Sequence, residues 1–160
     1  MDWALTYDTG QTIAAAVALY ETFEAFPNQS ISSVDPLGIA CTLAQAAMIR
    51  PDWINENGIL DGREWPGDKS PDKRDDGVGF KSVLVRSLAK LYRVLHRNQL
   101  QQALQTDIES FIRRQYDSNR NNNTNDQGQY GPLWTGPFEA PTSHSQMAVL
   151  DVMAAMHAIS

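Results

Sequence analysis

Apolar residues recur at every third or fourth position along most of the chain, which is the spacing of one face of an α-helix. The first stripe predicts a helix over residues 11–26 and consists of Ile13, Val17, Tyr20 and Phe23. Asp8 precedes it as a candidate N-cap, and Pro27 ends it because proline cannot continue a helix. The chain is therefore expected to begin with an amphipathic helix.

The same pattern predicts four more helices. The second begins at Asp35-Pro36, since aspartate caps a helix and proline suits its first position, and it ends before Pro51. The third follows Gly79, and its polar face carries a stripe of basic residues. Ser143 and Gln146 have the spacing of a capping box for the fifth. The apolar stripes of the last two helices are Leu100, Leu104, Ile108 and Phe111, then Met147, Leu150 and Met153.

Two long segments, residues 51–79 and 117–141, lack a helical pattern. Both exceed the ~12–15 residues above which a loop is usually functional or disordered. The asparagine-rich part of the second segment predicts a flexible loop over about residues 117–129. With 160 residues and no useful length of strand-like alternation, the chain is expected to form one all-α domain over 1–160.

A short repeat indicates how the helices pack. Leu19-Tyr20 in the first helix and Leu91-Tyr92 in the third are 72 positions apart, with one helical hairpin between them. This predicts that the first, third and fifth helices run parallel in one layer and that the second and fourth form another. The segments that lead into the three parallel helices are then expected to lie at one end of the molecule.

Composition excludes several classes of protein. Nineteen acidic residues against 13 basic ones give a net charge of −6, whereas nucleic acid favours a clustered basic surface. Cys41 is the only cysteine, which excludes an intramolecular disulfide and a cysteine-rich zinc site. The three histidines lack metal-ligand spacing, and glycine pairs such as Gly77-x-Gly79 lack the strand that precedes a phosphate loop. No metal and no cofactor are therefore expected.

The sequence predicts no membrane segment. The longest unbroken apolar run, residues 13–20, is far shorter than the roughly 20 residues that a transmembrane helix needs. The N-terminus also lacks the basic region of a signal peptide, because Asp2 and Asp8 precede the apolar run. Neither a transmembrane helix nor a signal peptide is expected in this chain.

Five segments carry a resemblance to a known family. In order and spacing the chain resembles glycoside hydrolase family 76, the endo-α-1,6-mannanases that act on fungal mannan, in the segments Leu5–Gln11, Ala18–Glu21, Gly58–Leu60, Phe80–Arg86 and Tyr130–Pro137. The resemblance implies an (α/α)6 barrel built of helical hairpins, and a secreted or cell-wall location. It implies a ligand of α-mannan or a mannose-containing oligosaccharide.

The resemblance covers only the C-terminal part of the family pattern. The family's chemistry rests on two adjacent aspartates in its N-terminal part, and the one adjacent pair here, Asp75-Asp76, precedes a later family segment. Glycoside hydrolysis needs two carboxyl groups on either side of the scissile bond. We therefore expect the chain to be part of an α-1,6-mannanase that is inactive alone. The alternatives are Asp75 and Asp76 as the catalytic pair, or Asp76 as the cap of the third helix.

Residues within the matching segments, and Asp76 shortly before one of them, are the candidates for sugar contact. An aromatic ring packs against the C–H face of a pyranose, while the sugar hydroxyls need polar neighbours. The resemblance implies substrate contact by Tyr7, Asp8, Asp76, Lys81, Tyr130 and Trp134. The structural alternatives are a wedge between loops and helices for Trp134, a helix start for Tyr7 and Asp8, and a solvated charge for Lys81.

Two other functions compete with the mannanase fragment. One is a non-catalytic carbohydrate-binding scaffold, which would keep the sugar-contacting loops. The other is a helical protein-interaction scaffold, which would not respond to mannan. An incomplete barrel would leave the stripe Ile13, Val17 and Tyr20 partly uncovered, so self-association through exposed apolar helix faces is also expected.

Overall fold

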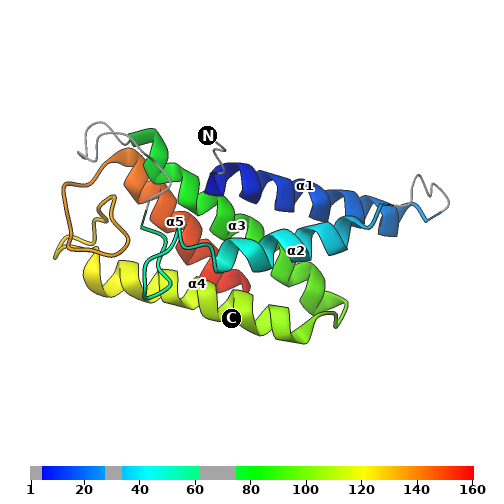
Figure 1. The fold of residues 1–160 in the computed structure, drawn as a ribbon. Coiled ribbons are helices and arrows are strands. Elements are labelled where there is room, and N and C mark those ends of the chain that lie inside the picture. Colours follow the sequence, from blue (N-terminus) through cyan, green and yellow to red (C-terminus); the bar gives the residue numbers. More distant parts are fainter. Residues whose placement is uncertain (1–4, 28–33, 62–74) are drawn as a thin grey trace.

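The computed structural model describes residues 5–27, 34–61 and 75–160 and contains five α-helices within them. They are α1 (Thr6–Ala25), α2 (Pro36–Met48), α3 (Asp75–Arg97), α4 (Gln102–Asn122) and α5 (Ser143–Ala158). Extended pairing in these ranges is limited to two isolated bridges. The prediction of an all-α fold made of helical hairpins is confirmed (Figure 1).

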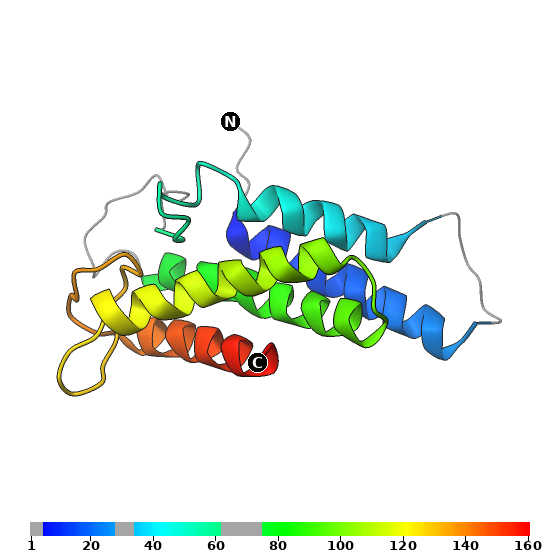
Figure 2. The same cartoon turned by 90° about the horizontal axis from the view of Figure 1, so that it is seen from below.

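The helices form two layers. α3 packs between α1 and α5, and these three helices run in the same direction (Figures 1 and 2). α2 packs mainly on α1, whereas α4 packs on α3 and α5, and both run the opposite way (Figure 2). This is the arrangement that the Leu-Tyr repeat predicts. No helix in the described ranges is long and apolar enough to span a membrane.

Local signals predict some helix ends and miss others. The carboxylate of Asp35 accepts a hydrogen bond from the Gly38 amide at 2.9 Å, which confirms the predicted cap of α2. Asp8 is not a cap, because α1 already begins at Thr6 and Asp8 lies inside its first turn. The capping box of α5 is formed by Thr142 and Ser145, one residue earlier than predicted.

Two helices are longer than predicted. α3 begins at Asp75, so Gly79 lies within the helix instead of preceding it. α4 continues through Asn122, so residues 117–122 are helical instead of part of a linker. Flexibility of the remaining loop residues stays a prediction. The longer α3 moves Lys81 from the first turn of the helix into its second.

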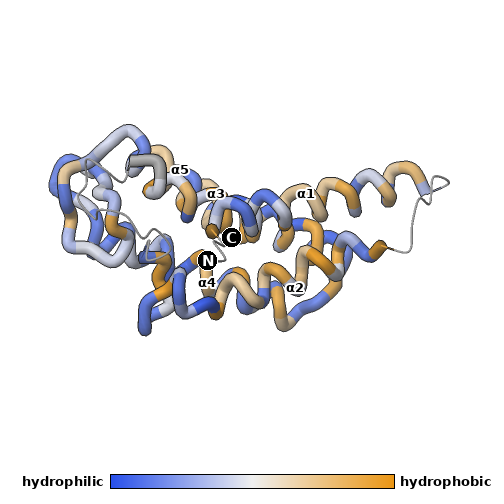
Figure 3. The backbone as a smooth tube through the Cα atoms, turned by 45° about the horizontal axis from the view of Figure 1, so that its top comes forward, coloured by the Kyte–Doolittle hydropathy of each residue, from blue (hydrophilic) through white to orange (hydrophobic). Residues whose placement is uncertain are grey.

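The core lies between the two layers. Ile13 and Val17 of α1 are fully buried and Tyr20 is half-buried, so the prediction that this stripe is left partly uncovered is wrong for its first two residues. On α5 the apolar stripe is displaced by one residue: Met147 and Leu150 are 64% and 61% exposed, and the buried side chains belong to Ala148, Val149, Val152 and Ala155. Small aliphatic residues let α5 approach α3 closely. Figure 3 shows the apolar character of α1 and α2 against the largely hydrophilic loop that follows α4.

A turn of the same construction follows both α2 and α4. In the first turn, the Asn55 side chain accepts hydrogen bonds from the amides of Asn57 and Ile59 at 2.9 and 3.0 Å. Asn125 does the same in the second turn, with bonds of 3.1 and 2.9 Å from residues 127 and 129. Gly58 and Gly128 occupy equivalent places with φ near 74° and 73°. The hairpin array is therefore repeated in its turns as well as its helices.

Candidate functional site

The starts of α1, α3 and α5 lie toward the same end of the molecule (Figures 1 and 2). Tyr7, in the first turn of α1, packs its ring against Phe80 of α3 at a centroid distance of 5.5 Å. The Tyr7 side chain is 40% exposed, and the neighbouring Asp8 is exposed as well. Both candidate sugar-contacting residues on α1 are therefore accessible to solvent at this end.

Lys81 is buried, so the alternative that it is a solvated charge is wrong. Its residue is only 2% exposed, and its ammonium nitrogen donates a hydrogen bond to the Pro132 carbonyl oxygen at 3.1 Å. The same nitrogen lies 4.8 Å from the centroid of the Trp134 ring. A buried charge is costly unless it is paired or solvated by the protein, and a cation–π contact is strongest where water is excluded. Lys81 thus links α3 to the loop after α4.

Two side chains of α5 hold the middle of that loop. The Tyr130 carbonyl oxygen accepts hydrogen bonds from the Ser145 hydroxyl at 2.7 Å and from the Gln146 side-chain amide at 2.6 Å. The Tyr130 side chain is half-buried and packs against the core. The backbone of Tyr130 is therefore fixed by the first turn of α5.

An asparagine at the end of α4 fixes the next residue. The amide of Gly131 donates to the Asn123 side-chain oxygen at 3.0 Å, and the Asn123 side-chain nitrogen donates back to the Gly131 carbonyl at 2.8 Å. The same nitrogen also donates to the side chain of Asn119 at 2.8 Å. Asn119 and Asn123 are both buried. The asparagine-rich sequence thus supplies hydrogen bonds that satisfy a buried backbone.

Trp134 lies beneath the surface. Its residue is fully buried, and its carbonyl oxygen accepts a hydrogen bond from the Ser118 hydroxyl at 2.7 Å. The indole nitrogen is buried without a hydrogen-bond partner among the described residues. This placement agrees with the alternative of a wedge between the loop and the helices. A contact between Trp134 and a sugar stays a proposal, and it would require the ring to become accessible.

A polar groove of about 340 Å³ lies between the Asn55–Ile59 turn, the second half of α4 and the loop at Thr135. Most of its polar side chains are amides and hydroxyls, which donate and accept hydrogen bonds without net charge. Its polar and charged lining consists of Asn55, Asn57, Arg114, Asp117, Ser118, Asn121, Asn122 and Thr135. None of these residues is among the sequence candidates. The N-x-x-G spacing of the turn and the run of asparagines after it are sequence signals that could have indicated them.

The groove holds a single carboxylate, that of Asp117, among the residues that line it. Two carboxyl groups roughly 5–10 Å apart are required for glycoside hydrolysis. Asp75 and Asp76 form the first two residues of α3, and their side chains lie outside what the structure describes. The described part of the groove has hydrogen-bonding groups for a polyhydroxylated ligand, and it has no acid–base pair. No cluster of possible metal ligands occurs among the described residues.

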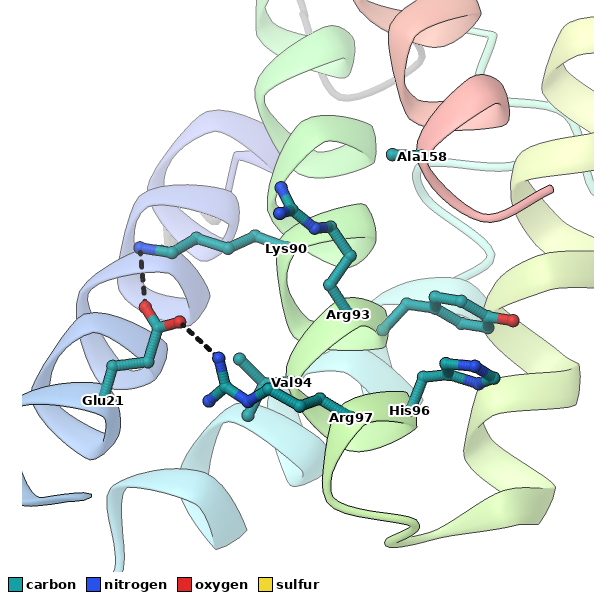
Figure 4. A pocket seen from close by; sticks show the side chains of 8 residues that line it. Glu21, Lys90, Arg93, Val94, His96, Arg97 and Ala158 are labelled. Carbon is teal, nitrogen blue, oxygen red and sulfur yellow. Dashed lines mark ion pairs between the residues drawn. The ribbon is translucent and has the colours of Figure 1, made fainter. Parts of the chain in front are cut away.

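The basic residues in the second half of α3 are Lys90, Arg93 and Arg97, and they line another groove, shown in Figure 4. Glu21 forms ion pairs with Lys90 at 3.8 Å and with Arg97 at 3.7 Å. Arg97 also pairs with Glu24 at 2.8 Å. Exposed ion pairs of this kind contribute little to stability, and here they neutralise most of the positive charge.

No protein-family model matches the sequence, and the search of curated proteins found no match. Among solved structures, the chain is similar to GH76A, an α-1,6-mannanase from Salegentibacter sp. HEL1_6, with 21% sequence identity and a TM-score of 0.78. The similarity covers 99% of this chain and 41% of that enzyme.

Two inactive variants of the same enzyme, each changed at two adjacent aspartates, show the same likeness. One is in complex with α-1,6-mannotetraose and the other with α-1,6-mannotriose. Their TM-scores are 0.75 and 0.74, at 21% identity and with the same coverage of both chains. This likeness shows a family 76-like helical fold. The chain spans about two fifths of the length of these enzymes.

Proposed function

We propose that this chain forms the C-terminal part of a family 76-like α-1,6-mannanase fold and that, alone, it binds α-1,6-mannooligosaccharides without hydrolysing them. The similar mannanase has been seen with α-1,6-mannotriose and α-1,6-mannotetraose, which supports this class of ligand. The observation that carries the proposal is the polar groove at Asn121 and Thr135. Its lining provides amides and hydroxyls for sugar binding but only one carboxylate, whereas hydrolysis needs two.

The loop over residues 130–136 supports the same conclusion. Lys81 of α3, Ser145 of α5 and Asn123, directly after α4, hold its backbone at three points, so the Thr135 side of the groove is positioned before any ligand arrives. Preorganised groups lose less conformational freedom on binding than mobile ones. We infer that these buried residues position the loop, whereas the exposed amides of α4 touch the sugar.

Isothermal titration with α-1,6-mannotetraose tests binding, and the release of reducing ends from α-1,6-mannan tests hydrolysis. We expect saturable binding, weakened about three- to tenfold by Asn121→Ala through the loss of a hydrogen bond, and no hydrolysis above buffer. Gln127→Ala, an exposed amide outside the groove, is the matched control.

Three results would change this conclusion. Hydrolysis that disappears in Asp76→Asn would make Asp75 and Asp76 the catalytic pair. An absence of binding to the tetrasaccharide would favour the protein-interaction scaffold. Equal affinity of Asn121→Ala and Gln127→Ala would move the ligand away from this groove.

A further inference from the structure

The connection between α3 and α4 contains two glutamines in an unusual backbone conformation. Gln99 has φ 55° and Gln101 has φ 50°, both in the left-handed region that favours glycine. The Leu100 amide donates to the Leu95 carbonyl at 2.9 Å, so Gln99 occupies the place in a helix-ending turn where glycine is usual. Gln101 precedes α4 and provides no side-chain cap. Strained conformations of this kind concentrate at functional sites.

The side chain of Gln99 lines a groove of about 450 Å³ at this corner. One wall consists of Tyr92 and His96, whose rings stack at 5.7 Å with an angle of 8° between their planes. Gln102 and Gln105 of α4 also line it. The groove therefore combines an aromatic wall with three side-chain amides.

These amides differ in how firmly they are held. Gln105 donates to the Leu100 carbonyl at 2.7 Å, and its oxygen lies 3.3 Å from the His96 ring nitrogen, so its orientation is fixed. The side-chain amides of Gln99 and Gln102 form no hydrogen bond within the described residues, and both side chains are exposed. Two amides are thus available to a ligand beside one that is preoriented.

The chemistry of the groove favours a neutral polyhydroxylated ligand. A side-chain amide donates and accepts at once, which suits neighbouring sugar hydroxyls, and aromatic walls suit pyranose C–H faces. The carboxylate of Glu109, which also lines the groove, is paired with Arg113 at 2.9 Å. The adjacent groove of Figure 4, by contrast, is bordered by the charged pairs of Glu21.

We propose that the corner between α3 and α4 is a second oligosaccharide-binding site, for a neutral chain of hexopyranose units. It lies outside the groove of the proposed function and involves none of that groove's residues. Glutamine at position 99 retains the left-handed conformation because its amide contacts the ligand, at the expense of stability that glycine would provide.

The test follows amide resonances while α-1,6-mannotetraose is added to the full chain, with maltotetraose as a second neutral probe. We expect saturable shifts in the side-chain amides of Gln99, Gln102 and Gln105 with at least one of the two sugars. Asn121 and Asn122 report the groove of the proposed function independently. Shifts at the glutamines alone would uphold the second site and count against the groove of the proposed function. Shifts at the asparagines alone, or no shifts at all, would overturn the second site.

Two matched variants separate binding from backbone strain. Gln99→Gly and Gln101→Gly both relieve a left-handed conformation, and we expect each to raise Tm by about 2–4 °C. Only Gln99 lines the groove. We therefore expect Gln99→Gly to weaken sugar binding at this corner about three- to tenfold, and Gln101→Gly to leave it unchanged. Equal affinities for the two variants would overturn the proposal, and a loss of binding by a stabilised protein excludes unfolding as its cause.

Discussion

The ammonium nitrogen of Lys81 lies 4.8 Å from the centre of the Trp134 ring, and both residues are almost fully buried. The hydrogen bond from Lys81 to the Pro132 carbonyl adds a second contact to the same loop. One helical side chain thereby fixes two points of the segment that borders the polar groove. The loop after α4 is part of the packed structure for this reason.

Replacing Lys81 by methionine keeps most of its packing volume and removes both the charge and the hydrogen bond. We expect a loss of about 1–2 kcal/mol in the free energy of unfolding, because the Pro132 carbonyl loses its charged donor. The loss is limited because the variant no longer has to bury an ammonium group. Hydrogen exchange of the Leu133 and Trp134 amides is expected to accelerate. Lys90→Met, which removes an exposed ion pair, is the control and should change stability by less than about 0.5 kcal/mol.

The crossing of α1 and α3 depends on Gly10. A methyl group at Gly10 would lie 2.8–2.9 Å from backbone atoms of Val83 and Leu84. We expect Gly10→Ala to lower stability by about 1–3 kcal/mol, since the two helices must move apart. Gly79→Ala is the matched control in α3, because nothing lies within 4 Å of the added methyl. It should stabilise the protein by about 0.5–1 kcal/mol through helix propensity, and urea unfolding of both variants measures the difference.

The features that the sequence predicts well are those set by neighbouring residues. The cap at Asp35 depends on contacts within a few positions, and the shared helical face of Ile13 and Val17 follows from helical spacing. The direction of the five helices follows from the Leu-Tyr repeat. In these cases local propensity and tertiary packing favour the same structure.

The features that the sequence did not predict depend on residues far apart in the chain. Lys81 is buried because Pro132, 51 positions later, accepts its hydrogen bond. Gln115 is buried because its side-chain oxygen accepts a hydrogen bond from the Leu60 amide and its side-chain nitrogen donates one to the Gly58 carbonyl, each at 2.9 Å. Polar residues such as Asn123 are normally assigned to the surface, and only the path of the loop shows that they are needed inside.

Stability is expected to fall at alkaline pH. Burial raises the pKa of the Cys41 thiol above its ordinary 9.0, with a smaller contribution from Asp35. Burial and a hydrogen bond to Glu24 raise the pKa of the Tyr20 hydroxyl above 10.0. The folded protein therefore holds these protons more tightly than the unfolded chain, so the stabilisation is complete below about pH 9 and is lost as pH rises further. Urea midpoints between about pH 7 and 10.5 measure the loss.

Two substitutions test the origin of this pH dependence. Cys41→Ala should flatten the lower part of the curve, and Tyr20→Phe the upper part, because each removes one titrating group. Both variants are expected to be less stable than the parent at neutral pH through lost packing, so the slope with pH is the relevant quantity. Unchanged slopes in both variants would show that other groups control the alkaline transition.

Self-association stays a prediction. Because the α1 stripe is largely buried, we expect the contact surface on α5 instead. Met147 and Leu150 lie three positions apart and are 64% and 61% exposed. The exposed residues of α5 are Ser143, Met147, Leu150, Ala154, His157 and Ala158, and none of them is a carboxylate, lysine or arginine. Asp151 beside them is half-buried and paired with Arg86 at 3.3 Å. Two copies of the chain can therefore bring these faces together without opposing like charges, despite the net charge of −6. Removing the two apolar side chains from water provides the driving force.

Sedimentation over a range of protein concentrations tests this contact. We expect a monomer–dimer equilibrium that Leu150→Gln weakens at least about tenfold, because each copy loses an apolar side chain from the interface. Ile49→Gln introduces the same polar group at a position 75% exposed, at the end of α2, and should leave the equilibrium unchanged. A parent protein that stays monomeric at every concentration, or two variants that weaken the dimer equally, would show that the α5 face does not mediate association.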